Sequence, residues 1–197
     1  AMIDGEWPHA YEPSGKARIG KSLIWRTLDD GRPIYNRKLS VDEVHQRIQR
    51  YALPYQAQLQ NLINEHHQQF GVCYHINCHS MSAVSGKMGE GGAGIARADV
   101  VLGDRDGTTC SAEFTHLVKD FMQQCGYEVK INDPFKGVEL VRAFSNPSQG
   151  KHSLQIELNK RLYTDSSGRD KGPGYDKLNQ DLIALTALLA DFSKHKI

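Results

Sequence analysis

The sequence predicts an α/β fold in which a layered mixed sheet is flanked by helices. Three observations predict it: short apolar segments with strand-like alternation, amphipathic segments with helical spacing between them, and Gly or Pro at the junctions. Because strands that alternate with helices favour a largely parallel or mixed sheet, we expect one layered domain over residues 1–197. A chain of this length can bury a sizeable core.

The N-terminal part of the chain is expected to be an irregular arm followed by a long helix. Residues 1–38 are rich in Gly and Pro, and a short strand is expected near residues 23–25. Ser40 and Glu43 form a capping box, and apolar residues follow at helical spacing, which predicts a helix that begins here. Pro54 lacks the N–H that a helix interior needs, so it should kink this helix or split it in two.

The remaining elements are expected to alternate between strands and helices. One amphipathic segment carries Phe114, Val118 and Phe121 on a single helical face, and Gly126 follows it where a left-handed residue is favoured. The expected order is a strand at 72–76, a glycine-rich loop at 85–94, a strand at 98–102, a helix at 111–125, a strand at 127–131, a short element at 138–144, a strand at 152–158 and a last helix after Pro173 and Gly174.

The composition argues against several classes of partner. The formal net charge is +1 and no run of Lys and Arg occurs, so we expect no nucleic-acid partner. No apolar stretch is long enough to cross a bilayer, and the first residues lack the pattern of a secretory signal, so no membrane is expected. The four cysteines show no C-x-x-C spacing, which favours a reduced, cytoplasmic chain.

His79 is the first candidate for chemistry. Strand alternation places it on the same face as Cys73, His75 and Asn77, where the strand is expected to end. A neutral imidazole in that position can bind Zn²⁺. A single histidine without context is more often a core or surface residue that is hydrogen-bonded to backbone.

Glu157 is the second candidate. Its strand places it on one face with Ser153, Gln155 and Asn159, opposite an apolar face. A carboxylate in that position could take a proton as a general base. The same polar face is as consistent with the solvated side of an antiparallel sheet, so both interpretations stay open.

The expected location of a binding site follows from the fold class. Ligands in open α/β sheets bind beyond the carboxyl ends of the strands, where we expect His79, residues 104–109 and residues 159–161 to lie together. The turn at 104–109 feeds a helix N-terminus, which is a natural anion site, although it lacks the spacing and the Lys of a phosphate loop.

Three arginines are candidates to bind a substrate carboxylate. Arg105, Arg142 and Arg161 each carry a guanidinium, which can bind a carboxylate in bidentate fashion. The alternative for any single arginine is a solvated ion pair, which is the commoner case.

Several motifs together resemble the N-formylglutamate amidohydrolase family. The matching segments are Gly31-Arg32-Pro33-Ile34-Tyr35 with Leu39-Ser40, then Pro54-Tyr55, Asn77-Cys78-His79-Ser80-Met81, Leu102-Gly103-Asp104-Arg105-Asp106-Gly107-Thr108, and Ser153-Leu154-Gln155-Ile156-Glu157-Leu158-Asn159 with Arg161-Leu162-Tyr163. The similarity runs from about residue 20 to residue 165. Its motifs would rarely occur in this order by chance.

This resemblance implies a zinc-carboxypeptidase-like, phosphorylase/hydrolase-like α/β fold and the hydrolysis of a small N-acyl amide, N-formyl-L-glutamate. It implies that His79 is a zinc ligand and that Glu157 is the general base. The residues that it implies for substrate binding are Arg105, Arg142, Arg161 and Asn159.

The sequence also departs from the family pattern. The family carries a further N-terminal portion with a Pro-His-small-Gly metal motif that nothing here matches, so we expect an N-terminally incomplete version of the fold. Of the three protein ligands of a catalytic zinc site only His79 is identified, and Asn77 stands where Asp is usual. The chain therefore resembles either an active zinc hydrolase, a hydrolase of another N-acyl amino acid, or a non-catalytic fragment without zinc that covers an exposed sheet edge as a homo-oligomer.

Overall fold

The structure is a computed structural model of the chain, and it describes residues 20–21, 23–28, 30–87, 89 and 92–196. The chain divides into two compact units, which are described separately: one takes in residues up to 59 together with 85–95, and the other takes in 60–84 and 96 onward. The expectation of a single domain over residues 1–197 stays a prediction. In the described part of the chain, no helix has both the length and the apolar character needed to cross a membrane.

The predicted helix begins after Ser40 and is interrupted before Pro54. Ser40 caps α2 (Val41–Arg47), and its hydroxyl accepts a hydrogen bond from a backbone N–H of the first turn at 3.2 Å. A π-helical segment, Ile48–Ala52, then leads into α3 (Leu53–Phe70). Because Pro54 cannot donate to the helical ladder, the ladder changes just before it, and the predicted interruption is confirmed.

The short strand expected near residues 23–25 is not present. In the described residues of this segment, β pairing is limited to two isolated bridges, Lys21 with Trp25 and Thr27 with Pro33. Gly and Pro residues in this segment interrupt strand pairing, so in its described residues no ladder extends beyond single residue pairs. The strand prediction is therefore wrong here, and residues 1–19 of the expected arm lie outside the described residues.

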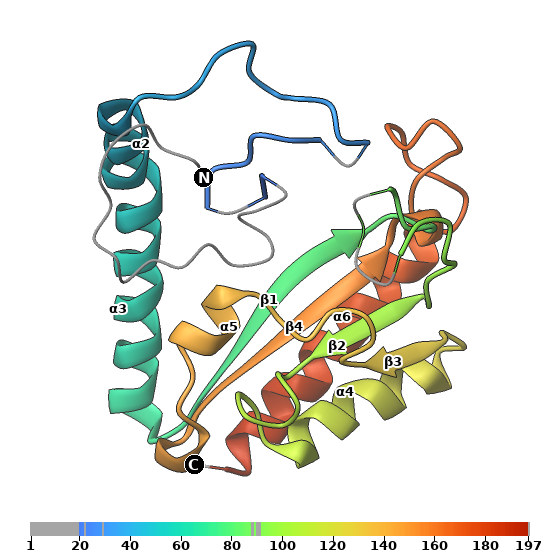
Figure 1. Cartoon of the computed structure of the whole chain (residues 1–197). Helices are drawn as coiled ribbons and strands as arrows, with labels where there is room; N and C mark the ends of the chain where they lie inside the picture. Colours follow the sequence, from blue (N-terminus) through green and yellow to red (C-terminus); the bar gives the residue numbers. More distant parts are fainter. Residues whose placement is uncertain (1–19, 22, 29, 88, 90–91, 197) are drawn as a thin grey trace. The chain divides into compact units, whose positions relative to one another are not determined.

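The second unit is built on a four-stranded sheet (Figure 1). In chain order its elements after α3 are β1 (Cys73–Met81), β2 (Val100–Gly103), α4 (Ala112–Gln124), β3 (Val129–Ile131), α5 (Glu139–Ala143), β4 (Lys151–Asn159) and α6 (Tyr175–Lys194), with 3₁₀ turns at Pro147–Gln149 and Lys160–Leu162. The strand order is β1-β4-β2-β3; β1 is parallel to β4, β2 is parallel to β3, and β2 is antiparallel to β4. This mixed sheet confirms the predicted fold class. β1 extends further than predicted, so His79 lies inside the strand and not at its end.

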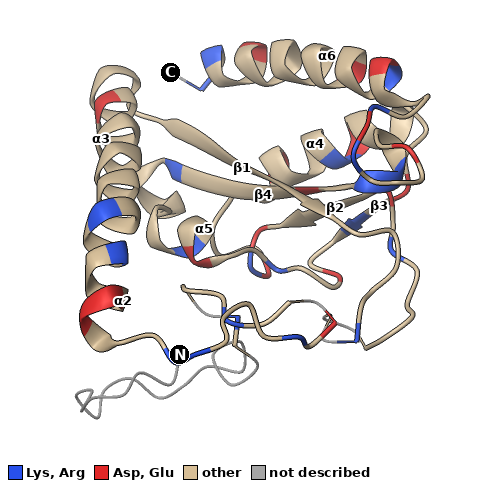
Figure 2. Cartoon of the chain, turned by 90° about the horizontal axis from the view of Figure 1, so that it is seen from above, with Lys and Arg blue, Asp and Glu red and all other residues tan. Residues whose placement is uncertain are grey.

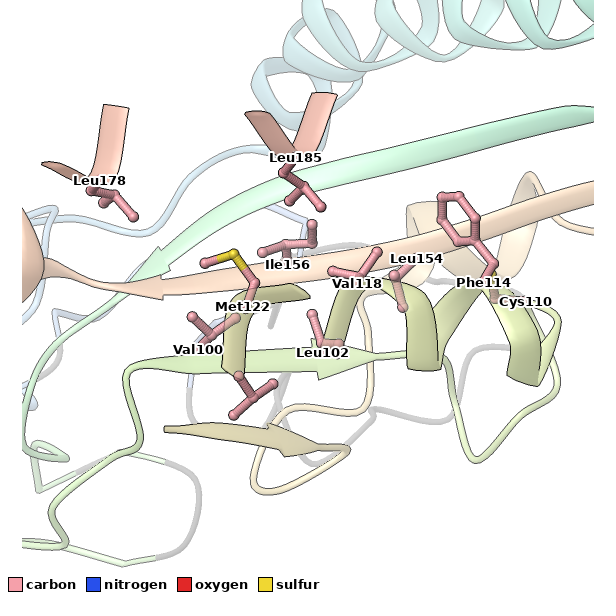
Figure 3. Close-up of a cluster of buried hydrophobic side chains, with 11 residues drawn as sticks. Val100, Leu102, Cys110, Phe114, Val118, Met122, Leu154, Ile156, Leu178 and Leu185 are labelled. Atoms are coloured by element: carbon pink, nitrogen blue, oxygen red, sulfur yellow. The ribbon is translucent and has the colours of Figure 1, made fainter. Parts of the chain in front are cut away.

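One face of the sheet is covered by α4 and α6, and α5 lies on the opposite side (Figure 2). Ser111 caps α4 by accepting a hydrogen bond from Phe114 N at 3.3 Å, and Gly126 follows the helix with φ 91°, as its left-handed position requires. The hydrophobic core lies between these helices and the sheet and contains Val100, Leu102, Cys110, Phe114, Val118, Met122, Val129, Leu154, Ile156, Leu178 and Leu185 (Figure 3). Burial of these apolar side chains turns the alternate residues of β1 and β4 toward the other face.

Candidate functional site

The sheet face opposite the core carries polar side chains that are buried. β1 and β4 pair in register, with His75 beside Ser153, Asn77 beside Gln155 and His79 beside Glu157. Only 1% of Gln155 and 6% of Glu157 is exposed. The interpretation of this face as the solvated side of an antiparallel sheet is therefore wrong. Buried polar groups usually require hydrogen-bond partners within the protein.

His79 and Glu157 face each other across the boundary between β1 and β4. His79 Nδ1 lies 3.8 Å from Glu157 Oε1. This distance is longer than a hydrogen bond. A ligand atom bound between the two side chains could contact both the imidazole and the carboxylate. The exposed fraction of the side chain is 36% for His79 and 8% for Glu157, so a ligand can approach along the imidazole while the carboxylate stays enclosed.

Gln155 is a polar group of this face to which the motifs alone assign no role. Its Nε2 donates to Glu157 Oε1 at 2.8 Å, and its Oε1 accepts from Val138 N at 2.8 Å. The neighbouring Asn77 is 7% exposed, and its Nδ2 has no hydrogen-bond partner among the described residues. Strand alternation, which places Gln155 on the face of Glu157, is the signal in the sequence that points to it.

Two of the candidate arginines lie near one another. Arg142, on α5, donates to both carboxylate oxygens of Glu139, with Nε 2.9 Å from Oε2. Arg105 is half-buried, and its Nη1 donates to Gly137 O at 3.0 Å. The hydrogen bonds from Arg142, together with the charges of Arg142 and Arg105, lower the pKa of the Glu139 carboxyl. Both guanidinium groups therefore act on a single carboxylate.

Arg161 and Asn159 are bonded to a different part of the chain. Arg161 donates to Asp99 Oδ1 through Nη2 at 2.8 Å and through Nε at 3.1 Å. Asn159 Nδ2 donates to Arg97 O at 3.2 Å and Ala98 O at 3.0 Å, while its Oδ1 accepts from Arg161 N at 3.1 Å. Contact with a substrate would require both side chains to give up these bonds, and their substrate roles stay predictions.

Residues 104–109 lie away from the carboxyl ends of β1 and β4, contrary to expectation. Because β2 runs antiparallel to β4, its carboxyl end lies toward the start of β4, and Gly103 pairs with Gln155. The loop that follows is bonded to β4 at Ser153, whose O accepts from Thr109 Oγ1 at 3.0 Å and whose N donates to Thr109 O at 2.7 Å. The expected location was wrong because hydrophobic alternation carries no information on strand direction.

Two histidines of the paired strands are enclosed, and burial lowers the pKa of both His75 and His152. His152 Nδ1 accepts a hydrogen bond from Ser111 N at 3.2 Å, which requires that nitrogen to be unprotonated. In the unfolded chain the same groups take up protons at higher pH than in the fold. The free energy of unfolding should therefore decrease as the pH falls below the ordinary histidine pKa of about 6.5.

This pH dependence can be measured by urea unfolding between about pH 7.5 and pH 5.5. His152→Gln keeps an acceptor for Ser111 N and removes one of the two titrating groups. Its free energy of unfolding should therefore fall less steeply with decreasing pH than that of the wild-type chain. Equal slopes for the two proteins would contradict a contribution from His152.

The donor set around His79 does not complete a metal site by itself. Among the described residues, no group of three or more His, Cys, Asp and Glu side chains gathers where it could hold one metal ion. A catalytic zinc site takes three protein ligands, and His79 with Glu157 provides at most two. These residues alone therefore do not fit a complete catalytic zinc site.

The sequence matches a family model described as N-formylglutamate amidohydrolase over residues 2–164. It is 24% identical over 144 residues to an N-formylglutamate deformylase from Pseudomonas putida, which covers 72% of this chain and 52% of that protein. An N-formylglutamate deformylase from Pseudomonas aeruginosa is 25% identical over 142 residues, covering 71% of this chain and 52% of that protein. The chain therefore spans about half the length of the curated relatives it matches.

The fold is similar to that in a crystal structure of N-formylglutamate amidohydrolase from Ralstonia eutropha JMP134. The TM-score is 0.89 at 39% sequence identity, and the match covers 99% of this chain and 70% of that chain. The family model covers most of the sequence, and the motifs around His79 and Glu157 lie within it. The chain belongs to the N-formylglutamate amidohydrolase family.

Proposed function

We propose that this chain hydrolyses N-formyl-L-glutamate to formate and L-glutamate. The observation that carries the proposal is the 3.8 Å approach of Glu157 Oε1 to His79 Nδ1 on neighbouring strands, in a chain of this family. The substrate is taken from the names of the relatives, N-formylglutamate deformylase and N-formylglutamate amidohydrolase. Because this chain spans about half of the deformylases it matches, activity of the 197-residue chain is itself part of the proposal.

Glu157 is proposed as the general base. Its carboxylate takes a proton from the attacking water as the water oxygen adds to the formyl carbon. The C–N bond then breaks, and the proton passes from Glu157 to the leaving amine, so that formate and glutamate are the products. The enclosure of Glu157 supports this role, since electrostatic interactions are stronger where water is excluded.

Arg105 and Arg142 are proposed to bind the carboxylates of the substrate. Both act on the carboxylate of Glu139, which a substrate carboxylate would replace as the bidentate partner of Arg142. The N-cap residue of α5, Val138, is hydrogen-bonded to Gln155 beside the proposed base. The candidate carboxylate-binding side chains are thereby linked to the site of chemistry.

Arg142→Met should raise KM for N-formyl-L-glutamate by about 10- to 100-fold and change kcat little. The reason is that one charge-assisted hydrogen-bonded pair contributes about 1.5–3 kcal/mol to binding. Arg169→Met, which removes an exposed guanidinium in the loop before α6, is the matched control and should leave KM unchanged. An unchanged KM in Arg142→Met, or an equal rise in both variants, would remove Arg142 from substrate binding.

Zinc is proposed as the cofactor, with His79 as one of its ligands. The proposal rests on the family resemblance and on the accessible imidazole, and no step above is assigned to the metal. Elemental analysis of the purified chain and of His79→Ala checks it. We expect zinc in the wild-type chain and at least about tenfold less in the variant, whereas equal zinc contents would reject His79 as a ligand.

Formate release tests the proposed function directly. Three compounds separate the substrate classes: N-formyl-L-glutamate, N-formyl-L-methionine and N-acetyl-L-glutamate. The first two are assayed for released formate and the third for released acetate. Preference for N-formyl-L-glutamate is the expected result. Turnover of only one of the other two compounds would assign a different N-acyl substrate, and no turnover of any would favour a non-catalytic protein with this fold.

Two further proposals concern the location of the protein in the cell and its self-association. The free thiols of Cys73, Cys78, Cys110 and Cys125 support a location in the reducing cytoplasm. Self-association stays a prediction, supported by the position of β1 at one end of the strand order, where exposed strand edges favour pairing with another chain. Sedimentation analysis at micromolar concentration would detect homo-oligomers.

A further inference from the structure

Gln155 is bonded at both ends of its side-chain amide. It is 1% exposed, its Nε2 lies 2.8 Å from Glu157 Oε1, and its Oε1 lies 2.8 Å from Val138 N. A backbone N–H can only donate, so the amide oxygen must face Val138. The NH₂ group must then face the Glu157 carboxylate. The chemistry of the two partners therefore fixes the orientation of this amide.

The loop that carries Val138 is held against the sheet at the same level. Gly103 is the strand partner of Gln155, and a Cβ added to Gly103 would lie 2.7 Å from Gly137 N and 2.8 Å from Lys136 C. Only glycine at this position permits so close an approach of two backbone segments. The donor at Val138 is therefore presented to Gln155 by backbone that is packed directly on β2.

We propose that Gln155 is a positioning residue, whose amide holds the Glu157 carboxylate toward His79 and ties it to the first turn of α5. The oxygen that accepts from Gln155 Nε2 is the one that lies 3.8 Å from His79 Nδ1. A glutamate side chain has three rotatable bonds, and a hydrogen bond to one oxygen selects among its rotamers. The catalytic part of this inference rests on the proposed function of Glu157.

The same amide links the two halves of the proposed site. α5 carries Glu139 and Arg142, and its N-cap residue is Val138. One buried side chain thus sets the position of the proposed base and, through the backbone of α5, the position of the arginine proposed to bind a substrate carboxylate. Loss of the hydrogen bond to Glu157 should lower kcat, whereas loss of the hydrogen bond from Val138 N should raise KM.

Two variants separate the bonds. Gln155→Glu keeps the size of the side chain and an acceptor for Val138 N, but it places a second carboxylate against Glu157. We expect kcat for N-formyl-L-glutamate to fall by about 10- to 100-fold, as for other hydrogen-bond partners of active-site groups, with KM changed less than about twofold. Gln155→Met removes both bonds, so kcat should fall and KM should also rise.

The control for lost hydrogen bonding is Tyr127→Phe. Tyr127 packs against the hydrophobic core and donates to Asp181 Oδ2, on α6, at 2.6 Å. This variant should leave both kinetic constants unchanged. An unchanged kcat in Gln155→Glu, with an active wild-type chain, would overturn the positioning role.

Nuclear magnetic resonance provides readouts that do not depend on turnover. The Val138 amide should exchange with solvent at least about tenfold faster in Gln155→Met and should stay protected in Gln155→Glu. The side-chain amide signals of Gln155 should shift in Glu157→Gln. If the wild-type chain releases no formate, the proposed function fails while these readouts still decide the inference. Unchanged Val138 exchange in Gln155→Met, or unchanged Gln155 signals in Glu157→Gln, would overturn it.

Discussion

Replacing Glu157 with glutamine is expected to lower kcat for N-formyl-L-glutamate by about 10²- to 10⁴-fold, the usual contribution of a general base. Glutamine has nearly the shape of glutamate, and its Oε1 can still accept the hydrogen bond from Gln155 Nε2. It cannot take a proton from water at neutral pH. The substitution therefore removes the proton-transfer step and leaves the packing of β4 in place.

Formate release and thermal unfolding, measured on the same preparation, separate these two effects. Glu113→Gln is the matched control, because Glu113 is an exposed carboxylate on α4 that pairs with Lys196. Glu113→Gln should unfold with the wild-type chain, since surface changes cost about 0.5 kcal/mol or less. Glu157→Gln should unfold within a few degrees of it, because the side-chain volume and the acceptor for Gln155 Nε2 are kept. Full turnover in Glu157→Gln would remove Glu157 from the mechanism.

Much of the fold could be predicted because it follows from local chemistry. The cap at Ser40, the interruption at Pro54 and the left-handed Gly126 are set by the side chain, the missing N–H or the missing Cβ of one residue. Hydrophobic alternation likewise located β1 and β4 and assigned their faces correctly. The short strand near residues 23–25 was wrong because strand formation also needs a partner, which a local pattern does not report.

The candidate site was predictable only in part. Motif resemblance selected His79 and Glu157, whose side chains lie 3.8 Å apart, but their chemical roles stay predictions. The loop at residues 104–109 was misplaced because its location depends on the antiparallel direction of β2. The positioning role proposed for Gln155 depends on its hydrogen bond with Val138 N. That donor is distant in sequence and lies beside Gln155 only in the folded chain.

Replacing Phe114 with alanine is expected to lower the free energy of unfolding by about 3–5 kcal/mol, the usual cost of emptying a buried aromatic site. Phe114 is 1% exposed, and its ring centroid lies 4.5 Å from that of Tyr74 and 5.6 Å from that of Phe192. These rings come from α4, β1 and α6, so the cavity would open where three elements meet. In a chain of this size the melting midpoint should fall by roughly 6–20 °C.

Phe70→Ala is the matched control, because Phe70 is 37% exposed and its loss should cost less than about 1 kcal/mol. Phe114 packs on the helix-covered face of the sheet, whereas Glu157 lies on the opposite face. At a temperature where both are folded, Phe114→Ala should therefore retain the kcat of the wild-type chain, and Glu157→Gln should retain its stability. A large loss of kcat in folded Phe114→Ala would contradict this expectation. It would show that packing against α4 determines the geometry of the polar face through the strands, so that core packing and catalysis depend on one another.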